Sequence, residues 1–100
     1  MRIFFLFVSL LYTGLAQPKQ PDPVVLIAGD VAQCASPGAH LTAQLIKNLP
    51  HPVLAAGDLA YPNGTLEEFT RCYAPSWGAF KDRTYPAPGN HDYRTPGAAG

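Results

Sequence analysis

The sequence predicts an α/β protein whose sheet is mostly parallel. Three short apolar segments, 24–28, 53–56 and 85–88, have the length of strands. The first two lack the alternation of a strand with one wet face, which favours strands covered on both faces, as in a parallel sheet. A helix-like pattern lies between the first two. Strand, helix and strand in this order predict a βαβ unit, which is right-handed in nearly all proteins.

Residues 1–16 predict a cleaved secretory signal peptide. Arg2 gives a positive start, residues 3–11 form an apolar run, and Gly14 and Ala16 place small residues before the cleavage point. The apolar run is shorter than the roughly 20 residues that a transmembrane helix needs. We therefore expect no stable membrane span and a secreted or periplasmic protein; an uncleaved anchor is the alternative.

Residues 17–23, with three prolines, predict an extended leader, so the domain is expected to occupy residues 24–100. The chain carries 7 Lys and Arg against 7 Asp and Glu, a formal net charge of zero. This balance excludes nucleic-acid binding by a basic patch, because such binding needs many cationic side chains on one face. An anionic ligand would have to be attracted by a bound cation.

Two cysteines, Cys34 and Cys72, would enter an oxidising compartment if the signal peptide is used. A disulfide between them is then chemically permitted. Two separate buried thiols are the alternative, and the sequence leaves both open.

The first helix is predicted to begin at Ser36 and to stop at Pro50. Leu41, Leu45 and Leu49 recur at every fourth residue, so they share one helical face. We expect this face to pack in the core.

A second helix is predicted after a Pro-Asn-Gly turn. Thr65 and Glu68 have the spacing of a capping box. Residues 63–65 also match the acceptor pattern for N-glycosylation, but a turn followed by a helix cap explains the same residues. Trp77 and Phe80 are expected to anchor the following segment onto the sheet.

Each predicted strand is followed by polar side chains, in Gly29-Asp30, in Gly57-Asp58 and in Gly-Asn-His-Asp at 89–92. Ligands of open α/β sheets gather at the carboxyl ends of the strands. Carboxylate, amide and imidazole groups suit hard divalent or trivalent cations, and a pair of such cations can activate water for phosphoryl transfer. One Gly-Asp pair alone is often just a turn. The three segments together favour a metal site.

These segments resemble the first three sequence blocks of the calcineurin-like metallophosphoesterases, and Gly57–Tyr61 is similar to the Gly-Asp-x-x-Tyr block of purple acid phosphatases. The resemblance covers Val24 to Asp92. It implies that this chain is the N-terminal half of a four-layer α/β/β/α sandwich. It also implies hydrolysis of a small-molecule phosphate ester, or of a phosphorylated substrate, at a dinuclear metal centre.

The resemblance assigns a role to five residues. Asp30 would bind the first metal and Asp58 would bridge both metals. Tyr61 would bind the first metal as phenolate, and Asn90 would bind the second through its amide oxygen. His91 would hydrogen-bond the phosphate and protonate the leaving alcohol. A phenolate ligand suits Fe(III), and Zn, Mn or Fe(II) would suit the second position.

The sequence departs from the family pattern at several places. Ala32 stands where members commonly carry His or Gly, and Asp92 where many carry Glu. His40 and His51 match no block. The family's later histidine blocks, including Gly-His-x-His, would follow Gly100, so we expect a larger enzyme whose first 100 residues are inactive alone.

Two other functions remain as alternatives. A truncated or degenerate relative would keep the fold as a non-catalytic binding or scaffold module. A nucleotide-binding α/β domain is disfavoured, because neither Gly-x-Gly-x-x-Gly nor a Walker motif is present.

Overall fold

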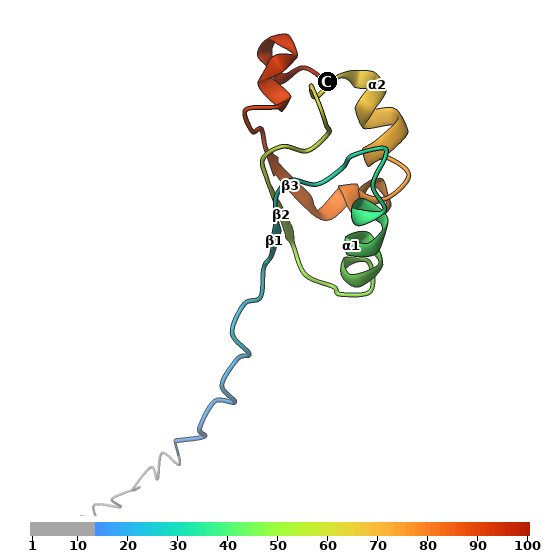
Figure 1. Ribbon diagram of the computed structural model, residues 1–100. Helices are drawn as coiled ribbons and strands as arrows, with labels where there is room; N and C mark the ends of the chain where they lie inside the picture. The colour runs from blue at the N-terminus through green and yellow to red at the C-terminus, as the bar shows by residue number, and fades with distance from the viewer. Residues whose placement is uncertain (1–13) are drawn as a thin grey trace, which may run out of the picture.

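The computed structural model of the protein describes residues 14–100. The predicted signal peptide falls mainly on residues 1–13, outside the described part. Residues 14–23 are exposed, lack helix and strand, and extend away from the folded part (Figure 1). Between residues 14 and 100, no helix has the length and apolar character needed to cross a membrane.

Three parallel strands form a single sheet, which confirms the predicted α/β class. The strands are β1 (Leu26–Ala28), β2 (Val53–Ala56) and β3 (Thr84–Ala87), in the order β1-β2-β3. β1 is shorter than the predicted segment 24–28, and β3 begins and ends one residue before the predicted segment 85–88. The main helices all lie on one side of this sheet (Figure 1).

Helix α1 (Gly38–Ile46) packs on the sheet through Ala39, Ala43 and Ile46, which are buried. The prediction that the leucine face of this helix enters the core is wrong. Leu41 and Leu45 are 57% and 72% exposed. Helix α1 ends at Ile46, before the predicted stop at Pro50, so Leu49, which is 42% exposed, lies beyond the helix.

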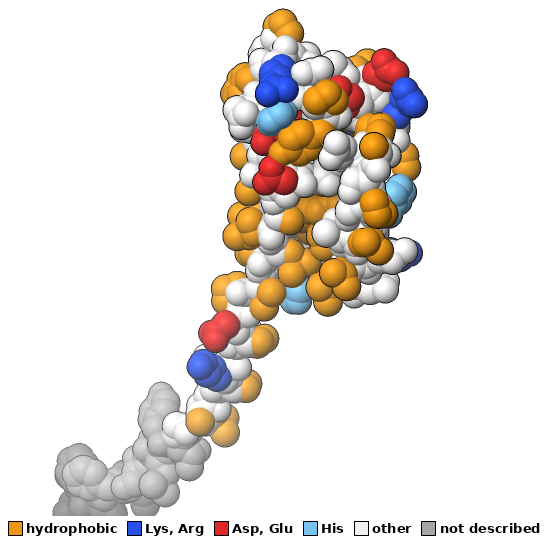
Figure 2. Space-filling view, viewed as in Figure 1, with side chains coloured by type: hydrophobic (Ala, Val, Ile, Leu, Met, Phe, Trp, Pro, Cys, Tyr) orange, Lys and Arg blue, Asp and Glu red, His pale blue; other side chains and the backbone are white. Residues whose placement is uncertain are grey.

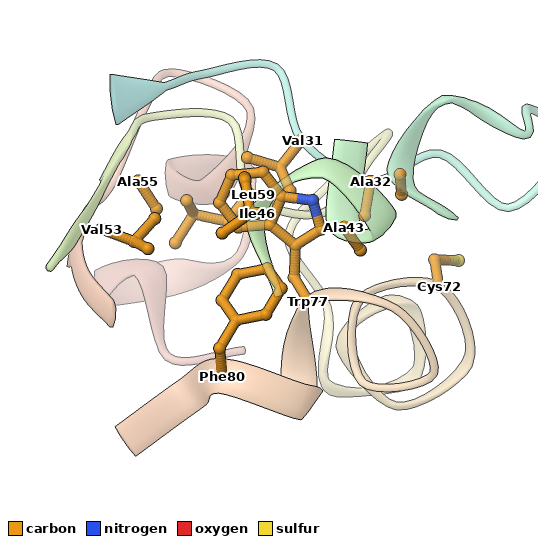
Figure 3. Close-up of a cluster of buried hydrophobic side chains, with 11 residues drawn as sticks. Val31, Ala32, Ala43, Ile46, Val53, Ala55, Leu59, Cys72, Trp77 and Phe80 are labelled. Atoms are coloured by element: carbon orange, nitrogen blue, oxygen red, sulfur yellow. The ribbon is translucent and has the colours of Figure 1, made fainter. Parts of the chain in front are cut away.

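Trp77 explains which face of α1 is buried. Trp77 and Phe80 belong to the 3-10 helix η2 (Trp77–Arg83) and are 1% and 3% exposed, as predicted for anchors. The indole Nε1 of Trp77 donates to Thr42 Oγ1 of α1 at 3.0 Å, so the large ring lies against this helix (Figure 3). The indole occupies much of the space between α1 and the rest of the core. The helix therefore turns its small alanine side chains toward the core, because leucines would not fit there as well.

The predicted capping box is confirmed. Thr65 Oγ1 accepts from the backbone N–H of Glu68 at 3.2 Å, and Glu68 Oε2 accepts from the N–H of Thr65 at 3.0 Å. The cap opens α2 (Leu66–Glu68), which continues directly into the π-helix η1 (Phe69–Tyr73). Gly64 supplies the turn before the cap with a left-handed φ of 62°.

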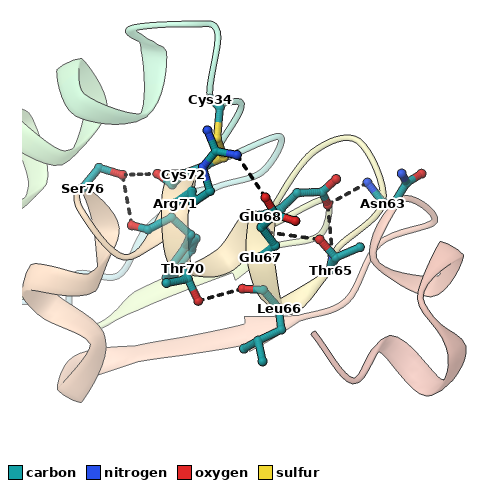
Figure 4. The surroundings of a disulfide bond; sticks show 11 residues. Cys34, Asn63, Thr65, Leu66, Glu67, Glu68, Thr70, Arg71, Cys72 and Ser76 are labelled. Carbon is teal, nitrogen blue, oxygen red and sulfur yellow. Dashed lines mark hydrogen bonds and ion pairs between the residues drawn. A yellow bond between two sulfur atoms is a disulfide. The ribbon is translucent and has the colours of Figure 1, made fainter.

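Cys34 and Cys72 form a disulfide, which settles the alternative that the sequence left open. Their Cα atoms lie 4.7 Å apart, within the usual range for disulfides. The bond joins the segment after β1 to η1 (Figure 4). It therefore ties one loop at the carboxyl edge of the sheet to the helical layer.

One face of the sheet is uncovered among residues 14–100, although the apolar runs favour strands covered on both faces. Ile27, Leu54 and Tyr85 are register partners across the three strands and are 66%, 39% and 62% exposed. We call these three side chains the apolar row. They are exposed because the described helices cover the opposite face of the sheet (Figure 1).

Candidate metal centre

The segments that follow β1 and β2 run side by side past the ends of the strands. The N–H of Asp30 donates to the carbonyl of Gly57 at 3.1 Å, and Ala32 forms a parallel bridge with Ala60. Asp30 and Asp58 adopt nearly the same left-handed backbone, with φ of 53° and 52°. This conformation is uncommon for residues other than glycine, and here it occurs at matching positions of two adjacent loops. Both carboxylates consequently reach the same edge of the sheet.

The hydroxyl of Tyr61 joins the two carboxylates. Its oxygen lies 3.0 Å from Asp58 Oδ2 and is also within hydrogen-bonding distance of Asp30 Oδ1. Because a phenol carries one proton, it donates to one of the two carboxylates at a time. Two carboxylate oxygens that share one hydroxyl lie within about 6 Å of each other. The hydrogen bond to Asp30, together with burial and the bond to Asp58, raises the pKa of Tyr61 above its usual range.

The loop after β3 contacts the carboxylate of Asp58. The backbone N–H of His91 donates to Asp58 Oδ1 at 2.9 Å. This bond holds the pKa of the Asp58 carboxyl below its usual value, although burial acts in the opposite direction. Gly89 is required at this approach, because an added Cβ would collide with the backbone and carboxylate of Asp58.

The imidazole of His91 is oriented by a backbone carbonyl. Its Nδ1 lies 2.8 Å from the carbonyl oxygen of Pro62, and its ring centroid lies 4.6 Å from that of Tyr61. Since a carbonyl can only accept, Nδ1 carries a proton and Nε2 faces away from this bond. Arg94 donates to the same carbonyl at 3.3 Å. Figure 2 shows basic, imidazole and acidic side chains next to one another on one face of the molecule.

Asn90 is exposed in the turn between Gly89 and His91. Within residues 14–100 its amide makes no hydrogen bond to the other four predicted site residues. Also within this range, no three His, Cys, Asp or Glu side chains gather into a group that could hold a metal ion. The structure thus brings Asp30, Asp58, Tyr61 and His91 together and leaves Asn90 beside them.

Asp92 has a structural role that sequence reasoning missed. Its side chain is 2% exposed and accepts from the N–H groups of Leu59 at 3.0 Å, Ala60 at 3.4 Å and Gly89 at 2.7 Å. One carboxylate therefore fixes the loop after β3 onto the loop after β2. In the sequence, a buried Asp beside a histidine looks the same as an Asp that faces the site.

Comparison of the chain with protein-family models, with curated proteins and with solved structures gave no match.

Proposed function

We propose that the protein hydrolyses phosphate esters at a dinuclear metal centre, as a calcineurin-like metallophosphoesterase of the purple acid phosphatase type. One observation carries this proposal. Asp30 and Asp58, from loops after two adjacent parallel strands, converge on the hydroxyl of Tyr61. This is the edge of an open α/β sheet where ligands bind.

The converging donors suit hard cations, because two carboxylates and a phenol offer oxygen ligands at one place. Asp58 directs its two oxygens to different neighbours, Oδ2 to Tyr61 and Oδ1 to the N–H of His91, which is compatible with a bridging carboxylate. Asp30 and Tyr61 would hold the first metal, with the phenol proton displaced. Asn90, exposed beside Asp58, would contribute to the second. Fe(III) would suit the phenolate, with Zn, Mn or Fe(II) as its partner.

The chain's own residues would then bind and orient the phosphate. The metal pair, when bound, supplies an activated water and neutralises developing negative charge. His91, held at Nδ1 by the Pro62 carbonyl, keeps Nε2 available for a phosphate or leaving-group oxygen. Arg94 adds a positive charge on the same side, where it favours the phosphate dianion.

The apolar row supports the four-layer sandwich that the proposal includes. A parallel sheet is normally covered on both faces, and Ile27, Leu54 and Tyr85 give the uncovered face an apolar surface. A second layer packed on this row would bury it. The disulfide supports export to a secreted or periplasmic location, because disulfides persist in oxidising compartments.

Phosphatase assays on the protein expressed from its complete reading frame, and loaded with iron and zinc or manganese, test the proposal. We expect turnover of p-nitrophenyl phosphate that Asp58→Ala lowers by more than about 100-fold, since a metal ligand matters more than its supporting residues. Asp82→Ala, an exposed carboxylate in η2, is the matched control and should keep full activity.

Equal activity of the Asp58→Ala variant and the wild type would contradict the dinuclear assignment. Metal binding with no phosphate-ester turnover by any form would instead identify the non-catalytic binding module.

A further inference from the structure

A pocket of about 340 Å³ adjoins two of the proposed metal ligands, Asp30 and Tyr61. It lies between the segment after β1 and the N-terminal half of α1, where Gln33, Ser36 and Thr42 line it. This volume is at the lower end of the range for small-molecule sites. The pocket therefore offers room for a small organic group directly beside the proposed centre.

The charge of this pocket differs from that of the opposite side of the centre. Among the described residues, Asp30 is the sole charged residue that lines the pocket. His91 and Arg94 both bond the Pro62 carbonyl and do not line it. A phosphate group thus finds the cationic side chain of Arg94 on the side of His91, whereas no Lys, Arg or His lines the pocket among the described residues.

The pocket also offers hydrogen-bonding groups that are still available. Gln33 is exposed, and its side chain makes no hydrogen bond to another residue in the range 14–100. Ser36 Oγ accepts from the N–H of Gly38 at 3.2 Å, which leaves its hydroxyl proton for a ligand. Thr42, by contrast, accepts from Trp77 and donates to the backbone of its own helix. One amide and one hydroxyl remain.

From these observations we infer that the pocket receives the alcohol part of a phosphate monoester and selects small, neutral, hydroxyl-bearing alcohols. This inference rests on the proposed phosphatase function. The hydroxyls of such an alcohol form hydrogen bonds with Gln33 and Ser36. These bonds replace the hydrogen bonds to water that the alcohol loses on binding. Apart from the proposed metal at Asp30 and Tyr61, a second phosphate group in the same place meets no cationic side chain, so diphosphates gain less there than hydroxyl-bearing alcohols.

The test compares kcat/KM for glycerol 2-phosphate, p-nitrophenyl phosphate and pyrophosphate, with the metal-loaded protein from its complete reading frame. We expect wild type to prefer glycerol 2-phosphate over pyrophosphate. Gln33→Ala should lower kcat/KM for the glycerol ester by about 5- to 10-fold, the value of one hydrogen bond, and leave the p-nitrophenyl ester within about 2-fold. Ser36→Ala should act in the same direction.

Gln44→Ala is the matched control, because Gln44 is an exposed glutamine of α1 that does not line the pocket. Equal effects of Gln33→Ala and Gln44→Ala on the glycerol ester, or a wild-type preference for pyrophosphate, would overturn the pocket assignment and leave the phosphatase function standing. No turnover of any ester by wild type would overturn the proposed function, and the pocket assignment with it.

Discussion

The loops after β1 and β3 both deliver side chains to the candidate centre, yet they are held by different means. The loop after β3 is fixed by Asp92, a buried carboxylate that accepts backbone N–H groups from two loops. The loop after β1 carries the exposed Asp30; it pairs through backbone hydrogen bonds with the loop after β2 and is in addition tied to η1 by the disulfide at Cys34. The loop after β3 is thus held by a buried side chain, whereas the loop after β1 is held by backbone pairing to which a covalent bond is added.

The largest effect is expected from removing the disulfide. The bond closes a loop with a sequence separation of 38 residues. In the loop-entropy model such a closure stabilises the fold by about 4 kcal/mol. The variant Cys34→Ala/Cys72→Ala should therefore lose up to this free energy of unfolding, measured by urea denaturation. Unchanged stability in the double variant would mean that backbone pairing alone holds the loop after β1.

Removing the Asp92 carboxylate should cost slightly less, about 3 kcal/mol, because it leaves buried N–H groups without an acceptor. The same denaturation measurement on Asp92→Ala checks this value. Asp82→Ala removes an exposed carboxylate and should change stability by less than about 0.5 kcal/mol. If the two variants lose equal stability, the hydrogen bonds of Asp92 do not fix the loop after β3.

Glu68 can be compared with Asp92, because its carboxylate also accepts backbone N–H groups but is only partly buried. It bonds the N–H groups of Asn63 and Thr65, each at 3.0 Å. Although burial acts to raise the pKa of Glu68, the hydrogen bonds from the Thr65 and Asn63 backbone outweigh it and lower that pKa. A lowered pKa in the folded state means that this stabilisation is complete above the unfolded value of about 4.3 and is lost as pH falls through the folded value.

Glu68→Gln should accordingly cost about 1 kcal/mol at pH 7 and progressively less at acidic pH. Denaturation of both proteins at pH 7 and at about pH 3 measures this difference. A cost that grows on acidification would contradict the sign of the shift.

Much of the fold follows from local patterns in the sequence. The apolar run 53–56 became β2 unchanged, and Thr65 with Glu68 formed the expected cap, because both depend on near neighbours in the chain. The buried face of α1 was not predictable, since its leucine face and its alanine face are both apolar. The choice between them depends on Trp77, more than thirty residues away.

The candidate site shows the same limit. The Gly-Asp turns predicted that Asp30 and Asp58 lie at the carboxyl edge of the sheet, and they do, because the ends of neighbouring parallel strands meet there. The role of Asp92 depends on N–H groups from a different loop, which no local pattern reports. Whether Cys34 and Cys72 pair likewise depends on how η1 lies against the loop after β1.

The central claim is that Asp30, Asp58 and Tyr61 hold a cation together, and addition of Fe(III) to the purified protein tests it most directly. An iron–tyrosinate bond absorbs visible light, so the account predicts a coloured complex in wild type that Tyr61→Phe abolishes. Tyr93→Phe, which alters an exposed tyrosine two residues after His91, should retain the colour. A colourless wild-type protein, or an undiminished band in Tyr61→Phe, would contradict the claim.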